Sequence, residues 1–410
     1  MFLSNDLVLS LGEKYGTPLY VYSEAILRER CREMKNLLPN KNLRVNYSAK
    51  ANTNLELLKI IKDEGLDVDA MSPGEIFIEQ LAGFESKQIF FISNNVSAEE
   101  MRYAIDKGIL ISVDSLSQLE MYGQINPGGK VAVRFNPGKG AGHHDKVITA
   151  GKKTKFGVQK ELIPQVKDIL QKYNLELVGI NQHIGSLFLE WQVYVEGVQS
   201  FLEIAKEFPG LSFIDIGGGF GVPYKSDETR LDINRLGTEL DKVLTKFLEE
   251  YPNKEVTFKI EPGRYIVAEC GVLLGSVYSV KKSYDTTYIG TDIGFNVLAR
   301  PVMYDSYHEV EIVKNKSSDN GINDTRQTAT IVGNICESGD ILARDREIIS
   351  AEVGDILVTF NAGAYGYVMS SNYNCRLRPA EVLIGLDGKD RLIRKRDTLE
   401  SLIQNFPTSF

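Results

Sequence analysis

Several side chains capable of chemistry stand at the ends of short apolar runs of the sequence. Lys50 ends the run LRVNYSAK, and Glu261 and Arg264 enclose the turn EPGR. A lysine that is partly removed from water can act as an amine nucleophile, as imine formation requires. A carboxylate and a guanidinium around one turn can hold a ring nitrogen and an anionic group of one cofactor. Considered singly, the lysine also fits a solvated strand end, and the turn fits a solvated salt bridge.

The run DIGGGFG (215–221) has the composition of an anion-binding loop, because glycines leave several backbone N–H groups uncovered. A dinucleotide fingerprint is disfavoured because Val222 and Pro223 follow where a helix should begin. A glycine turn of purely structural use is the alternative. His183 is one of only four histidines, and it fits either stacking on a planar ligand or a place in the core.

The segment CESGD (336–340) places a cysteine beside acidic residues. Such a cysteine is expected to remain a thiol, which suits proton donation better than nucleophilic attack. A half-buried structural cysteine is the alternative reading. The pair His143–His144 before Asp145 has no third ligand at a suitable spacing, so no metal site is predicted.

The elements that must position these residues follow a regular rhythm of short β-branched or aromatic runs and helical stretches. NLELLKIIKDEG (54–65) and AEEMRYAIDKG (98–108) have apolar residues at helical spacing before a glycine. Eight strands that alternate with helices predict a (β/α)8 barrel, whose function collects at the carboxyl ends of its strands. The eight predicted strands lie in the runs 43–50, 66–72, 89–94, 110–115, 131–138, 177–186, 212–219 and 257–263.

After Gly263 the sequence changes to strands separated by turns, with little helix, which is typical of an antiparallel β domain. The strand TPLYVYS (17–23) near the amino terminus is expected to belong to this second domain. The predicted domains are therefore a barrel over residues 26–270 and a β domain over residues 1–25 and 271–410.

Composition limits the class of protein. The 410 residues carry a net charge of −8, which gives no electrostatic reason to expect nucleic acid or an anionic membrane as partner. No apolar run is long enough to span a membrane, and the amino terminus lacks the features of a signal peptide. The four cysteines are scattered without a CxxC pair, which indicates a reducing compartment. A cytoplasmic location is therefore expected.

Taken together, the motifs resemble those of the fold-type III pyridoxal-phosphate decarboxylases, from about residue 17 to residue 386. Each motif is weak alone, but their common order along the chain is specific. The matching motifs are YSAKAN (47–52), DAMSPGE (69–75), HIGS (183–186), GGGFG (217–221), EPGR (261–264), ARPVMYDSYHEV (299–310), CESGD (336–340), GAYGYVMSSNYN (363–374) and RPAEVLI (378–384).

The resemblance implies pyridoxal 5′-phosphate as the cofactor. Lys50 would hold it as an imine, His183 would stack on its ring, and Glu261 would keep the ring nitrogen protonated. The backbone of the glycine run would bind the phosphate. The implied cofactor contacts are Lys50, Asp69, His183, Ser186, Gly217, Gly218, Gly219, Glu261, Pro262, Gly263, Arg264 and Tyr365.

The resemblance also implies decarboxylation of meso-2,6-diaminopimelate to L-lysine and carbon dioxide. Cys336 would donate the proton, and Glu337 would recognise the distal ammonium group of the substrate. The implied dimer would share its active sites, with Cys336 and Glu337 reaching the neighbouring subunit. Substrate contacts would come from Arg264, Arg300, Tyr304, Glu337 and Tyr365.

The alternatives are related decarboxylases of carboxynorspermidine, ornithine, lysine or arginine, and a racemase built on the same two domains. Glu337 and the ARPVMY pattern favour a substrate with a second amino-acid head, whereas a polyamine-pathway enzyme more often has aspartate after the cysteine. Racemases use a pair of bases, and the presence of Cys336 and Glu337 argues against a racemase. A cofactor-carrying protein without activity would lack the lysine or the cysteine, and this sequence has both.

Overall fold

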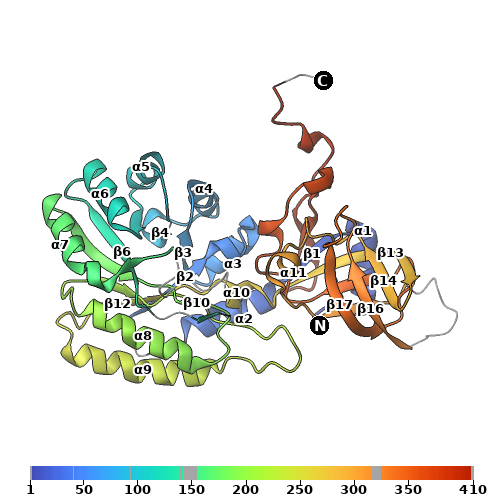
Figure 1. Ribbon diagram of the computed structural model, residues 1–410, viewed down its shortest axis with the longest axis horizontal. Helices are drawn as coiled ribbons and strands as arrows, with labels where there is room; N and C mark the ends of the chain where they lie inside the picture. The colour runs from blue at the N-terminus through green and yellow to red at the C-terminus, as the bar shows by residue number, and fades with distance from the viewer. Residues whose placement is uncertain are drawn as a thin grey trace. The chain divides into compact units, whose positions relative to one another are not determined.

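The computed structural model of the chain describes residues 2–39, 41–92, 94–138, 141–142, 155–315 and 325–407. The chain divides into two compact units. One unit consists of Arg28–Pro223 and Thr229–Ile266, and the other of Met1–Leu27, Tyr224–Glu228 and Val267–Phe410 (Figure 1). We call them the barrel unit and the β unit and describe each by itself. The region around His143–His144 lies outside the described residues.

The barrel unit contains a closed parallel barrel of eight strands, which confirms the predicted fold class. The first strand β2 pairs with the last strand β12, and the pairing of β5 with β6 completes the ring. Two-residue strands supplement it, since β8 (Val158–Gln159) pairs with β6, and β10 (Gly185–Ser186) pairs with β7 (Ala141–Gly142). The barrel strands are β2 (Leu43–Ser48), β3 (Asp67–Ala70), β4 (Ile89–Ile92), β5 (Leu110–Val113), β6 (Lys130–Asn136), β9 (Glu176–Asn181), β11 (Phe213–Asp215) and β12 (Thr257–Ile260).

Five helices of the barrel unit, α3, α4, α5, α6 and α9, begin after a residue whose side chain caps the first turn. Asn54 accepts the backbone N–H of Glu56 at the start of α3, and Ser97 forms a reciprocal capping box with Glu100 at the start of α5. Both predicted helices are thereby confirmed. The helices are α2 (Glu24–Lys35), which begins in the β unit, α3 (Leu55–Asp63), α4 (Pro73–Leu81), α5 (Ala98–Asp106), α6 (Leu116–Ile125), α7 (Ile163–Lys172), α8 (Trp191–Ala205), α9 (Ile233–Glu250) and α10 (Arg264–Val267).

In the barrel unit, a pair of aromatic rings packs against the side chain of Lys259. The rings of Phe90 and Phe213 meet edge to face with their centroids 5.3 Å apart. The Nζ atom of Lys259 lies 4.7 Å from the first ring centroid and 4.4 Å from the second. Burial lowers the pKa of this lysine, and the nearby carboxylates of Asp215 and Asp67 oppose the shift.

The β unit is a sheet of mixed rather than purely antiparallel pairing, which corrects one part of the prediction. β1 (Leu19–Ser23) lies between β13 and β19, antiparallel to the first and parallel to the second. β14 and β16 also pair in parallel. Strands far apart in the chain are not joined by a hairpin, so nothing in the connection fixes their direction.

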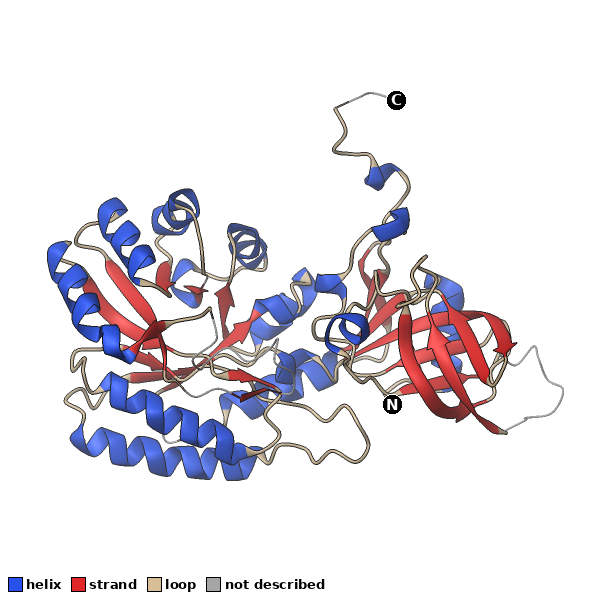
Figure 2. Cartoon of the chain, in the orientation of Figure 1, coloured by secondary structure: helices blue, strands red, loops and turns tan. Residues whose placement is uncertain are grey.

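The β unit contains further elements that the sequence did not reveal. Helix α1 (Asn5–Tyr15) precedes β1, with Ser4 as its capping residue, and the five residues of β1 are all buried. Figure 2 shows the predominance of strands after β13. These strands are β13 (Gly271–Ser283), β14 (Thr286–Thr291), β15 (Val310–Val313), β16 (Arg326–Val332), β17 (Ile341–Ile349), β18 (Ile356–Thr359), β19 (Ala380–Ile384) and β20 (Asp390–Arg394), with the short helix α11 (Arg300–Tyr304).

Within the described residues, no helix combines the length and apolar content needed to cross a membrane.

Candidate active site

Lys50 lies at the carboxyl end of barrel strand β2, in a single turn of 3-10 helix, Ala49–Ala51. The residues around it tie three strands together. The backbone N–H of Ser48 donates to the carbonyl oxygen of Pro262 at 3.1 Å, and the Ser48 hydroxyl donates to Asp69 Oδ2 at 2.7 Å. The end of β2 is therefore fixed against the turn after β12 and against β3.

The turn after β12 comes close to the end of β2 because it contains glycine. A Cβ atom on Gly263 would lie 3.0 Å from the Cβ of Ser48, which leaves no room for a larger residue without a shift. Arg264 begins α10, is buried, and donates from Nη2 to the Ser186 hydroxyl at 3.1 Å. The predicted Ser186 and Arg264 are thus brought together although 78 residues separate them.

The glycine run forms a tight loop directly after β11. Gly217 and Gly219 have φ of +79° and +111°, values that favour glycine. A Cβ atom on Gly218 would collide with the carbonyl oxygen of Glu261, and one on Gly219 would collide with the ring of Phe188. Glycine is therefore required here by the closeness of neighbouring backbone and side chains.

His183 follows β9 and contacts this loop. The backbone N–H of Gly218 points at its Nδ1 atom, 3.4 Å away. Burial, together with the positive charges of Lys50 and Arg134, lowers the pKa of His183 well below its ordinary value. The imidazole is therefore neutral at physiological pH, which suits contact with an aromatic ring.

Glu261 supplies a buried carboxyl group at the end of β12. Burial and the neighbouring Asp215 raise its pKa well above the ordinary value, while Lys50 and Arg134 act in the opposite direction. Its Oε1 atom is buried and has no hydrogen-bond partner among the described residues. Such a carboxyl group gains from a cationic N–H partner, so the site fits the protonated ring nitrogen of a pyridoxal cofactor.

Asp69 is a second buried carboxyl group in this set. Burial and then Glu261 raise its pKa well above the ordinary value, and the charge of Lys50 opposes the shift. The fully buried carboxyl groups and the lysine therefore act on one another at the same end of the barrel. Beside the glycine loop and His183, they make a compact set of groups for one anionic, aromatic ligand.

Two further charged groups belong to this end of the barrel but received no role from the sequence. Asp215 ends β11 and accepts the backbone N–H of Gly217 at 2.9 Å, and burial raises its pKa to about 6. Burial lowers the pKa of Arg134 on β6, against the carboxylates of Glu261 and Asp114. The signal that could have found Asp215 was its position at the carboxyl end of β11.

Among the predicted substrate residues of the β unit, Arg300 and Tyr304 lie on α11. Arg300 is only 2% exposed, its Nη1 atom lies 2.9 Å from Nε2 of His308, and its guanidinium stacks over the ring of Tyr224 at 4.7 Å. His308 Nδ1 lies in turn 2.8 Å from the carbonyl oxygen of Phe360. The guanidinium is therefore held in one direction, as recognition of a carboxylate requires.

Cys336 and Glu337 lie on the loop between β16 and β17, and both are exposed. The side chain of Asp340 organises this loop by accepting the N–H of Ile335 and of Phe295, each at 2.7 Å. Tyr365 lies on another loop with φ of +55°, in a conformation that few non-glycine residues adopt. The exposed cysteine and glutamate are thus held on an ordered loop.

No group of three or more histidine, cysteine or acidic side chains in the described part of the chain is arranged to hold a metal ion.

Comparisons with known proteins give consistent results. The family profile described as "Pyridoxal-dependent decarboxylase, pyridoxal binding domain" matches residues 24–268. The diaminopimelate decarboxylase of Methanothermobacter thermautotrophicus is 40% identical over 97% of this chain and 94% of its own length. That of Escherichia coli is 33% identical over 98% of this chain and 96% of its own.

Solved structures of diaminopimelate decarboxylases are also similar to this chain. A crystal structure of diaminopimelate decarboxylase superimposes with a TM-score of 0.91 at 32% identity, covering 98% of this chain and 96% of the other. The Helicobacter pylori diaminopimelate decarboxylase complexed with L-lysine gives a TM-score of 0.87 at 30% identity, covering 96% of this chain and 98% of the other.

Proposed function

The chain belongs to the pyridoxal-dependent decarboxylases, in the diaminopimelate decarboxylase family, and we propose that it converts meso-2,6-diaminopimelate to L-lysine and carbon dioxide. It is a carboxy-lyase that depends on pyridoxal 5′-phosphate. The observation that carries this function is the set of groups at one end of the barrel. Lys50, the glycine loop and the unpartnered oxygen of Glu261 offer an amine, an anion site and a partner for a ring nitrogen.

When bound, pyridoxal 5′-phosphate supplies an electron sink for the electron pair left by the departing carboxylate. We assign the covalent attachment to the Lys50 amine and the phosphate to the backbone of Gly217–Gly219, with Ser186 and Arg264 beside it. Glu261 would keep a proton on the ring nitrogen, because a buried carboxylate is stabilised by a neighbouring cation. His183, neutral in its surroundings, would contact the aromatic ring of the cofactor.

For the substrate, we assign the carboxylates to Arg300, Arg264 and Tyr304. Glu337 receives the distal ammonium group, and the Cys336 thiol gives its proton to the carbon that loses the carboxylate. Arg300 suits its role because His308 and Tyr224 fix its guanidinium before any substrate arrives.

We also propose a homodimer in which Cys336 and Glu337 complete the site of the neighbouring subunit. Both residues are exposed on their loop, and an exposed thiol is a poor proton donor to a reactive carbanion unless water is excluded around it. A partner surface would exclude that water. We further propose a cytoplasmic location, which suits the four cysteines, all of them free thiols.

A panel of substrates tests the function. The protein, loaded with pyridoxal 5′-phosphate, is given meso-diaminopimelate, L-lysine, L-ornithine and carboxynorspermidine in separate reactions, and carbon dioxide is measured. We expect release from meso-diaminopimelate at least about 100-fold faster than from the others, since a selective polar site rejects analogues strongly. Equal rates, or a preference for another member of the panel, would overturn the substrate assignment.

A further inference from the structure

Two neighbouring residues hydrogen-bond to the two candidate residues on the β16–β17 loop. The Tyr373 hydroxyl donates to Glu337 Oε1 at 2.6 Å, and the backbone N–H of Cys336 donates to Asn374 Oδ1 at 2.9 Å. The first bond sets the direction of a side chain, and the second sets the backbone that carries the thiol. Both bonds connect the same two short segments, Cys336–Glu337 and Tyr373–Asn374.

The Tyr373 ring cannot move freely, because it stacks on Phe295. The ring centroids lie 5.6 Å apart with an interplanar angle of 23°. The backbone N–H of Phe295 in turn donates to Asp340, which organises the Cys336 loop. The tyrosine hydroxyl is therefore held relative to the loop that it contacts.

The backbone at Asn374 has an unusual conformation, and this conformation allows its side chain to accept the hydrogen bond from Cys336. Asn374 and Cys375 have φ of +56° and +55°, so two successive non-glycine residues lie in the left-handed region. Asparagine tolerates this region better than most residues, and the turn directs its side chain to the Cys336 N–H. Such a conformation persists only where the surroundings hold it.

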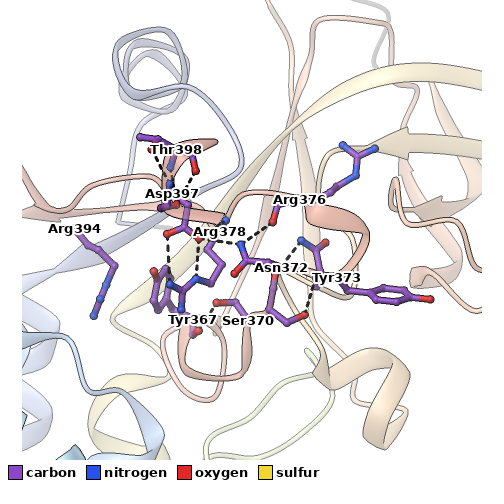
Figure 3. A network of polar contacts seen from close by, with 12 residues as sticks. Tyr367, Ser370, Asn372, Tyr373, Arg376, Arg378, Arg394, Asp397 and Thr398 are labelled. Atoms are coloured by element: carbon purple, nitrogen blue, oxygen red, sulfur yellow. Dashed lines mark hydrogen bonds and ion pairs between the residues drawn. The ribbon is translucent and has the colours of Figure 1, made fainter. Parts of the chain in front are cut away.

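Figure 3 shows the hydrogen bonds that hold the segment around Asn374 in this conformation. Asp397 accepts from Arg378 Nε and from Asn372 Nδ2, each at 3.0 Å, and Asn372 also donates to the carbonyl oxygen of Arg376 at 2.9 Å. Burial alone would raise the pKa of Asp397, but the hydrogen bonds from Arg378 and Asn372 lower it on balance. Tyr373 points away from this cluster. The hydrogen bonds of Asn372 and Arg378 with Asp397 therefore hold the segment in place, while the Tyr373 hydroxyl bonds to Glu337.

We propose that Tyr373 and Asn374 are positioning residues: Tyr373 directs Glu337 toward the distal amino-acid head of the substrate, and Asn374 fixes Cys336 for proton donation. This inference rests on the proposed function. One Glu337 oxygen is occupied by the hydroxyl, which leaves the other for an ammonium group. A long, exposed side chain is ordered before binding, so less conformational entropy is lost when the substrate arrives. The hydrogen bond to Glu337 raises the pKa of Tyr373, so the hydroxyl remains a donor throughout the physiological range.

The first test uses Tyr373→Phe, which keeps the ring on Phe295 and removes only the hydroxyl. We expect the KM for meso-diaminopimelate and the Kd for L-lysine, measured by calorimetry, to rise about three- to tenfold, with kcat within about twofold. L-lysine is a suitable probe because it retains the distal head of the substrate. Tyr284→Phe, at a tyrosine that is 95% exposed between β13 and β14, is the matched control and should leave both constants unchanged.

The second test distinguishes the hydrogen bond that the Asn374 side chain accepts from the effect of residue 374 on backbone stability. Asn374→Gly tolerates the left-handed conformation but removes the acceptor, and we expect kcat to fall about three- to tenfold with little change in KM. Asn374→Asp keeps an acceptor oxygen and should retain most of kcat. Asn95→Gly, at an exposed asparagine with φ of +58° in the barrel unit, is the control for the glycine.

Glu337→Gln distinguishes failure of this inference from failure of the proposed function. If Glu337→Gln leaves KM unchanged, the proposed role of Glu337 is wrong and the inference fails with it. If Glu337→Gln raises KM and Tyr373→Phe does not, only the positioning role of Tyr373 is wrong. We expect the double variant to be no worse than Glu337→Gln alone, since the hydroxyl acts through the carboxylate. Additive losses, or equal loss of kcat in Asn374→Gly and Asn374→Asp, would contradict the inference.

Discussion

The candidate residues of the barrel unit and those of the β unit are held by different means. In the barrel unit they lie at the ends of parallel strands, and Asp69, Glu261 and the glycine loop are buried or enclosed by backbone. In the β unit, Cys336 and Glu337 lie on an exposed loop that side-chain hydrogen bonds hold in place. The difference indicates that the fold itself fixes the residues proposed to hold the cofactor, whereas the residues proposed for proton donation and for the distal head of the substrate depend on a few hydrogen bonds.

The largest effect is expected from the barrel unit. Lys50→Ala should abolish carbon dioxide release, with a loss at least on the order of 10⁴-fold, because it removes the amine that we propose carries the cofactor. The visible absorbance of the bound cofactor should disappear as well. Lys59→Ala, at a lysine of α3 paired with Glu56, is the control. A Lys50→Ala protein that keeps both activity and absorbance would refute the assignment.

Cys336→Ser tests the exposed loop of the β unit with the cofactor left in place. We expect kcat to fall about 10²–10⁴-fold, which is the usual contribution of a positioned proton donor, while the cofactor absorbance stays unchanged. Cys375→Ser changes the other exposed cysteine and should be nearly neutral. Equal losses in the two variants would argue against a specific donor at Cys336.

The pH dependence of stability in a Glu79 variant tests how strongly burial in the barrel unit shifts the pKa of a carboxyl group. Glu79 is 0% exposed, and neither of its carboxyl oxygens has a hydrogen-bond partner among the described residues. Burial, then Asp69 and Glu75, raise its pKa from 4.5 to about 9. Because the pKa is higher in the folded state, its contribution to stability is fully present below the unfolded pKa. That contribution is lost as the pH rises toward about 9.

Glu79→Gln should therefore gain stability relative to the wild type as the pH rises. We expect the difference in unfolding free energy to change by up to about 1.4 kcal/mol per pH unit between about pH 5 and pH 9. Urea unfolding at several pH values measures it, with Glu99→Gln at an exposed position as control. A difference that does not vary with pH would show that the buried carboxyl group is ionised at neutral pH.

The smallest effect on catalysis is expected from a change at Asp397, which holds the segment that carries Tyr373. Asp397→Asn keeps the shape but weakens the contacts with Arg378 and Asn372, so the segment should become less ordered. We expect a two- to fourfold rise in KM for meso-diaminopimelate and an unchanged cofactor absorbance. Asp387→Asn, in an exposed turn, is the control. A changed absorbance would contradict the separation of cofactor groups from substrate groups.

The sequence predicted the barrel well because its signals are local. The strands are short apolar runs, several helices have a cap such as Asn54 or Ser97, and the strand ends identify candidate residues without knowledge of the packing. The parallel pairing of β1 with β19 could not be predicted, since the two strands are more than 350 residues apart. The roles of the site residues came from family motifs rather than from spacing.

Other features depend on packing that sequence patterns do not record. The sequence of α4, PGEIFIEQL, gives no sign that Glu79 is fully buried or that its carboxyl group is influenced by Asp69 and Glu75. The contact of Tyr373 with Glu337 joins residues 36 positions apart across two loops, for which no periodicity exists. Such contacts become visible only when the loops are placed.

The most direct test of the proposed reaction is its stoichiometry. The protein loaded with pyridoxal 5′-phosphate is given a limiting amount of meso-diaminopimelate, and carbon dioxide and the enantiomers of lysine are quantified at completion. We expect one carbon dioxide and one L-lysine for each molecule consumed. Interconversion of diaminopimelate stereoisomers without carbon dioxide, or further decarboxylation of lysine to a diamine, would contradict the proposed function.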